Sequence, residues 1–196
     1  MEVIALVVLY VIGIFLVSGF FLTVSADRVR ARLVQTWGAY AARNRHAFTK
    51  GQTPERAFRI QGARDGQEFL LETDTRGGLV TRLVAQTSSP PVSRVVATVG
   101  RARDGDSKGL KVPTGDPHFD RVFDVRAFDT HAVEVVLRSN VRMALQRFPL
   151  PMVGARLRLV VDGEEVIVEW AGGEVDPMQI EAAHTVVREL CRDRSG

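Results

Sequence analysis

The chain has 196 residues, of which 45% are hydrophobic, with 26 basic and 23 acidic side chains and a single cysteine, Cys191. One cysteine excludes an intramolecular disulfide. Six basic residues and one acidic residue lie between positions 26 and 50, whereas residues 51–196 carry 20 basic and 21 acidic residues. Because binding to a phosphate backbone requires a basic face on the folded domain, we expect no nucleic-acid partner.

The N-terminal residues 3–24 form an uncharged, apolar run. A bilayer core of ~30 Å needs about 20 apolar residues in a helix, so we predict a transmembrane anchor over residues 1–25. A cleaved signal peptide is the alternative, because Val24-Ser25-Ala26 offers small residues for cleavage. Its other features disagree, since no Lys or Arg precedes the run and the run is longer than a signal-peptide core.

Three arginines, Arg28, Arg30 and Arg32, directly follow the predicted anchor. Basic residues collect on the cytoplasmic side of membrane helices. We therefore expect a single-pass protein of the bacterial inner membrane, with its N-terminus outside and its C-terminal domain in the cytoplasm. The same arginines suit anionic lipid headgroups as ligands. The alternative topology is an exported envelope protein.

Residues 26–50 are predicted to form a basic juxtamembrane helix. Val29, Leu33, Trp37 and Tyr40 recur at spacings of three and four residues, which is typical of an amphipathic helix. A continuous helix carries Trp37 ~20 Å beyond the membrane face, too far for an interfacial anchor. We expect Trp37 and Tyr40 to pack on the soluble domain, the alternative being a helix that bends and lies along the headgroups.

Residues 51–196 have the length of one domain, and their turn signals and alternation predict an α+β fold. We expect one mostly antiparallel sheet of six or seven strands with two helices on one face. A barrel resembling pleckstrin-homology domains is the alternative architecture. Leu79, Leu83 and Ala85 are the expected core residues of the strand at 79–86. Strands are predicted at 57–62, 67–73, 79–86, 92–99, 123–128, 156–161 and 164–170.

Residues 114–125 carry the most distinctive local pattern. Asp116 followed by Pro117 is typical of a helix N-cap and first helical residue. Phe119 is expected to be buried below this turn, and Phe123 to begin a strand whose inward residues are Phe123, Val125 and Ala127.

This segment resembles one in uncharacterised bacterial single-pass membrane-anchored proteins, which carry a GD-x-x-FD-x-x-F-x-V motif in their soluble domain. The resemblance implies an anchor followed by a soluble mixed domain, and it implies no activity. The matching residues are Gly115, Asp116, Phe119, Asp120, Phe123 and Val125.

The C-terminal third is predicted to complete the scaffold. A helix over 132–146 is expected to break near Ser139, which would cap its second part. The final helix is expected to start at Asp176-Pro177, with Gln179 completing a capping box. Its buried stripe is predicted to be Ile180, Ala183, Val187 and Leu190. A charged, glycine-containing stretch at 101–108 is predicted to be a mobile loop.

The chain carries no G-x-S-x-G, H-x-x-x-H, C-x-x-C or phosphate-loop pattern, so no catalytic residue, metal or cofactor is assigned. This favours a membrane-tethered binding or scaffold module whose partners are the lipid bilayer and an unidentified protein. The alternative is a membrane-anchored, hydrolase-like enzyme that uses Asp116, His118 and Asp120. That enzyme requires the three side chains to converge in a cleft, whereas a purely structural segment has Asp116 bonded to backbone amides.

Overall fold

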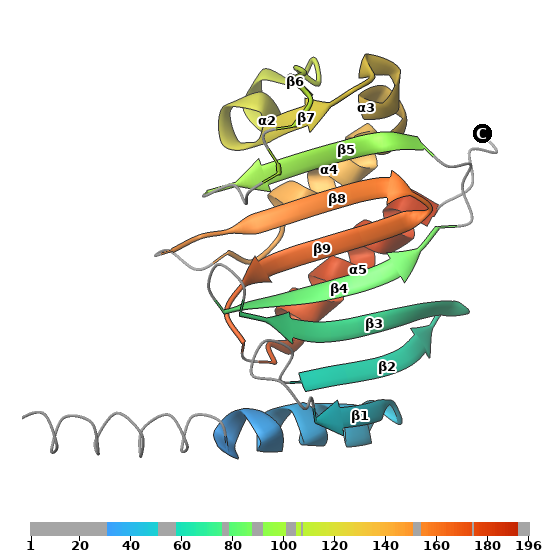
Figure 1. The fold of residues 1–196 in the computed structure, drawn as a ribbon, viewed down its shortest axis with the longest axis vertical. Helices are drawn as coiled ribbons and strands as arrows, with labels where there is room; N and C mark the ends of the chain where they lie inside the picture. Colours follow the sequence, from blue (N-terminus) through green and yellow to red (C-terminus); the bar gives the residue numbers. More distant parts are fainter. Residues whose placement is uncertain are drawn as a thin grey trace, which may run out of the picture.

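Nine strands form one antiparallel sheet in the order β1-β2-β3-β4-β9-β8-β5-β7-β6 (Figure 1). The computed structural model describes residues 31–50, 58–75, 79–87, 92–100, 105–106, 108–150, 154–173 and 175–191. The strands are β1 (Ala47–Lys50), β2 (Phe58–Arg64), β3 (Gln67–Asp74), β4 (Val80–Gln86), β5 (Val92–Val99), β6 (Leu110–Lys111), β7 (Asp124–Ala127), β8 (Leu157–Gly163) and β9 (Glu165–Ala171).

Two helices, α4 (Ser139–Gln146) and α5 (Pro177–Cys191), cover one face of the sheet (Figure 1). Two shorter helices, α2 (Pro117–Val122) and α3 (Thr130–Val136), lie beside β5 and β7. Among the described elements, none covers the opposite face of the sheet, which we call the open face. The predicted α+β class with one antiparallel sheet is confirmed.

Alternation along the strands explains why only one face is covered. In β9, Val166, Val168 and Trp170 are buried on the helix side. In the neighbouring β8, Leu157 and Leu159 are fully buried. Because successive side chains point to opposite faces, these residues build a continuous apolar layer under α4 and α5. Each such side chain contributes about 1.5–3 kcal/mol when it leaves water.

The helical segment at residues 31–44 belongs to the same core. Leu33, Trp37 and Ala41 are spaced by four residues and are all buried. The indole Nε1 of Trp37 donates a hydrogen bond to the Gly173 carbonyl at 2.9 Å, and its ring lies 5.7 Å from that of Phe58. The expected packing of Trp37 on the soluble domain is therefore confirmed.

The predicted anchor at residues 1–25, together with Arg28 and Arg30, lies outside the described residues. Within the part of the chain that the structure describes, no helix combines the length and hydropathy that crossing a bilayer requires.

The predicted number of strands was too low. Neither β1 nor β6 was expected, because β1 shows no buried alternation and β6 has only two residues. These two strands lie at opposite edges of the sheet, so the sheet is open and the barrel alternative is wrong. Leu79 was also assigned wrongly to the core: it precedes β4 and is 43% exposed, whereas Leu83 and Ala85 are buried as expected.

Two of the predicted helix caps differ in the structure. Ser139 does not cap α4, whose N-cap is Arg138 without a side-chain hydrogen bond. Gln179 donates to the Pro149 carbonyl at 3.1 Å and so ties α5 to the end of α4, in place of the expected capping box. Asp176 does act as predicted, because its carboxylate accepts the Met178 amide at 2.9 Å.

Candidate functional site

The segment around Asp116 forms a turn that starts α2. Gly115 has a φ of 78°, a conformation that glycine adopts without strain. The Asp116 carboxylate accepts hydrogen bonds from the amides of His118 at 3.0 Å and Phe119 at 3.1 Å, with Pro117 in the first turn. The hydrogen bonds from these amides, with Arg142 nearby, hold the pKa of Asp116 below its usual range. Asp116 is thus a helix cap.

The remaining motif residues also serve the turn. Asp120 accepts hydrogen bonds from the Thr114 amide at 3.0 Å and from the Thr114 hydroxyl at 2.8 Å. The rings of Phe119 and Phe123 stack with centroids 4.2 Å apart, and both are buried. The motif therefore closes a turn with its two aspartates and fixes α2 to the core with its two phenylalanines.

The geometry does not support a catalytic group at Asp116, His118 and Asp120. The two carboxylates are committed to separate hydrogen bonds, and His118 is exposed. A cavity of about 350 Å³ lies beside this turn, and among the described residues that line it are Thr114, Gly115 and Arg142 but none of the three candidates. Asp116 is bonded to backbone amides, which is the arrangement expected of the structural alternative.

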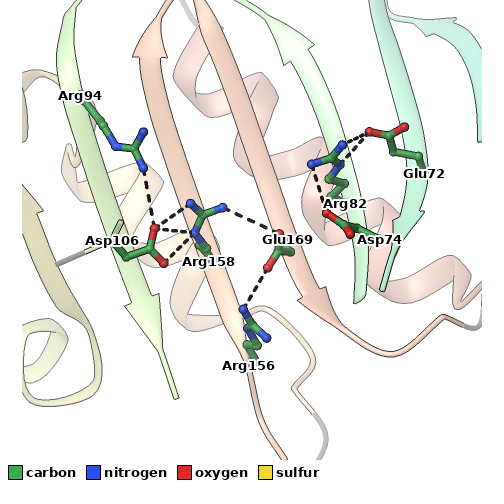
Figure 2. A network of polar contacts seen from close by, with 8 residues as sticks. All are labelled: Glu72, Asp74, Arg82, Arg94, Asp106, Arg156, Arg158 and Glu169. Atoms are coloured by element: carbon green, nitrogen blue, oxygen red, sulfur yellow. Dashed lines mark hydrogen bonds and ion pairs between the residues drawn. The ribbon is translucent and has the colours of Figure 1, made fainter. Parts of the chain in front are cut away.

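A row of alternating charges crosses the open face of the sheet (Figure 2). The strand register places Arg59 opposite Glu72, and Glu72 opposite Arg82. It then places Arg82 opposite Glu169, and Glu169 opposite Arg158. We call these five residues the charge row. Opposite charges facing each other across strands stabilise a sheet by roughly 0.2–1 kcal/mol per exposed pair.

The carboxylates of the charge row are buried although no helix covers them. Glu72 is contacted by Arg82 Nε at 2.7 Å and by Arg59 Nη2 at 3.1 Å. Arg156 Nη2 lies 3.5 Å from Glu169 Oε1, and Arg158 Nη1 lies 3.8 Å from Glu169 Oε2. The side chains of Glu72 and Glu169 are 3% and 0% exposed. Arginine keeps its proton at every physiological pH, so these pairs hold structure and do not exchange protons.

Asp106 extends this network. Arg158 donates hydrogen bonds to the Asp106 carboxylate from Nε at 2.9 Å and from Nη2 at 2.7 Å (Figure 2). Arg94 Nη2 lies 3.7 Å from Asp106 Oδ1. The predicted mobile loop at 101–108 lies largely outside the described residues, yet Asp106 within it is buried against the sheet. A bidentate arginine–carboxylate pair is strong and geometrically specific.

A groove of about 800 Å³ runs between α4 and α5 on the outer side of the helix layer. Met143 and Met178, which are 43% and 70% exposed, line it together with Ala144 and Ala182. Methionine adapts to differently shaped apolar ligands. The groove combines this apolar lining with the charged side chains of Arg147, Glu181 and Glu189.

Among the described histidines, His184 has the most strongly shifted pKa. It lies edge-on to Phe69 with ring centroids 4.5 Å apart, and its Nε2 is buried. Burial, helped by the positive charge of Arg64, lowers its pKa to about 4, so it is neutral at pH 7. No group of three His, Cys, Asp or Glu side chains within the described ranges is arranged to hold a metal ion.

Sequence reasoning missed the charge row and the groove. The charge row had a visible signal, because Arg82 alternates with the buried Thr81 and Leu83, but its place opposite Glu169 depends on a strand order that goes from β4 to β9. The groove had no signal, because single methionines in two separate helices do not indicate a shared surface.

Comparisons with known proteins identify one solved structure with a similar fold. No protein-family model matches the chain, and no curated protein matches it. The crystal structure of the mycobacterial trehalose monomycolate transport factor A, TtfA, superimposes with a TM-score of 0.59 and 11% sequence identity. The match covers 82% of this chain and 94% of that chain. At this identity the match establishes similarity of fold only.

Proposed function

We propose that this chain is a membrane-tethered binding module that serves a transport assembly through contacts with another protein. The observation that carries the proposal is the burial of Trp37 and Leu33 in the domain core. These residues follow the predicted anchor closely, so a domain fixed to them is held beside the bilayer. The fold similarity to TtfA, named as a transport factor, supports the transport assignment.

The groove between α4 and α5 supports the binding role. An apolar groove of about 800 Å³ has the size of a typical ligand pocket and suits an apolar helix or side-chain cluster of a partner. On the opposite face of the sheet, the arginines of the charge row pair with buried carboxylates and stabilise the scaffold that carries the groove.

The anchor and the topology are tested on the full chain in bacterial cells. Carbonate-washed membranes should retain the protein. With Cys191→Ser as background, His131→Cys on an exposed helix position should react with a membrane-impermeant maleimide only after lysis. Labelling in intact cells would instead indicate an exported protein, and a soluble product beginning near Asp27 would indicate a cleaved signal peptide. The first result overturns the expected cytoplasmic orientation, and the second overturns the tether and with it the proposal.

Partner binding is tested by placing a photo-crosslinking amino acid at position 143 in the groove. We expect a discrete adduct with one membrane protein there and none at the control position 131, which is exposed on α3. The substitution Ala182→Glu should abolish the adduct without changing protein level. An adduct that is equally strong at both positions, or that persists in the Ala182 variant, contradicts the use of this groove.

A further inference from the structure

One end of the domain lies next to the first turns of the helical segment at 31–44. Trp37 bonds to Gly173, which precedes α5, and the Gly172 amide donates to the Leu79 carbonyl at 3.0 Å. The opposite end of the segment lies near Gly62, where an added Cβ would come within 2.5 Å of the His46 ring. The segment therefore runs from the Leu79 end of the sheet to the opposite end (Figure 1).

The length of the chain determines which end faces the bilayer. Six residues lie between Val24, the end of the apolar run, and Ala31, so the two are seven residue steps apart. They span about 10 Å as a helix and at most about 25 Å fully extended. Ala31 starts the segment on the Leu79 side, so we call this side of the domain the anchor-side end.

The anchor-side end carries exposed apolar side chains. Leu79 is 43% exposed and Met178, in the first turn of α5, is 70% exposed. Val122 is 47% exposed and lies two residues before Asp124, the first residue of β7. The register places the start of β7 at this end, because Asp124 pairs with Thr98 near the end of β5. These three are half of the large exposed apolar side chains found on the described residues.

Exposed arginines accompany these apolar residues. Arg32 lies in the first turn of the described helical segment, and Arg121 precedes Val122. Arg147 ends α4 beside Pro149, which the Gln179 hydrogen bond joins to the start of α5. The acidic side chains nearest Met178 have other partners: Asp176, which precedes α5, caps that helix, and Glu181 pairs with Arg64 at 2.7 Å. Apolar residues with arginines are the composition that binds an anionic membrane surface.

We infer that the anchor-side end of the domain rests on the anionic phospholipid surface, with Leu79, Val122 and Met178 among the headgroups and Arg32, Arg121 and Arg147 against their phosphates. This inference rests on the proposed tethering and adds that the domain itself is a lipid-contacting surface. The domain is then held in one orientation, in which the groove between α4 and α5 has its Arg147 and Met178 end at the headgroups and its Asn140 and Glu189 end away from them.

The test uses the full chain in nanodiscs made of phosphatidylcholine with phosphatidylglycerol. Single cysteines at 79, 122 or 178, in a Cys191→Ser background, carry an environment-sensitive fluorophore, and some lipids carry a headgroup quencher. The controls are Leu110→Cys and Phe128→Cys, which are 72% and 63% exposed and lie near the opposite end of the sheet. We expect quenching roughly threefold stronger at the anchor-side positions than at the controls.

Charge gives a second readout. Arg121→Glu with Arg147→Glu should reduce the quenching at position 178 toward the control value, as should replacing phosphatidylglycerol by neutral lipid. Equal quenching at positions 178 and 110, or no response to either charge change, overturns the inference. These outcomes are separate from failure of the tether, because a chain that carbonate extracts from membranes contradicts the proposed function before any quenching is measured.

Discussion

Removing the Trp37 indole should detach the juxtamembrane helix from the domain. The side chain is fully buried, and an indole of this kind removes about 150–250 Å² from water. Trp37→Ala should therefore lower the free energy of unfolding by about 3–5 kcal/mol. Trp37→Phe keeps most of the packing but leaves the Gly173 carbonyl without its donor, which should cost about 1–3 kcal/mol.

The measurement is urea unfolding of the full chain in detergent micelles, followed by far-ultraviolet circular dichroism. Hydrogen exchange of residues 31–44 distinguishes detachment of the helix from global unfolding, since detachment raises exchange only in this segment. Gln35→Ala changes an exposed position of the same helix and should alter stability by less than about 0.5 kcal/mol. If Trp37→Ala costs no more than Gln35→Ala, the helix is not held by this side chain and the reasoning is refuted.

Three further predictions concern stability. Because the pKa of His184 falls from 6.5 unfolded to about 4 folded, acidification from pH 7 to pH 4 should cost about 3 kcal/mol more in the wild type than in His184→Gln, as measured by unfolding free energy across this pH range. Asp116→Ala should lower the melting temperature because the cap of α2 is lost, whereas Asp116→Asn should stay near wild type. Arg158→Met removes the bidentate partner of the buried Asp106 and one of the arginines beside the buried Glu169, and should cost about 3–5 kcal/mol in denaturant unfolding, against almost nothing for the exposed Arg188→Met; equal effects would contradict the role of the charge row.

Local signals in the sequence predicted much of the fold. Asp116-Pro117 and Asp176-Pro177 placed two helix starts, because an aspartate cap and a proline at the first position both suit freed backbone amides. The stripe at Leu33 and Trp37 predicted a buried helix face, because residues four apart share one side.

Features that depend on distant pairing were not predictable. The strand order places β9 beside β4, so the register that sets Arg82 opposite Glu169 joins two segments remote in the sequence. Leu79 matched the apolar alternation, yet it lies one residue outside its strand, where the pleat no longer directs it inward. Ser139 was expected to cap because of its chemistry, but the backbone at Arg138 turns the chain without that hydrogen bond.

The charge row also distinguishes correct from shifted strand alignment while the protein folds. Sliding β4 by two residues along β3 keeps every apolar side chain on its proper face, so the hydrophobic pattern alone tolerates the error. The slide would set Glu72 opposite Val80 or Val84, so its carboxylate would lie beside an apolar side chain without an arginine opposite it. The charged side chains of the charge row therefore favour the correct strand alignment, as the apolar layer does. A variant without these charged side chains would be prone to mispaired, aggregating intermediates.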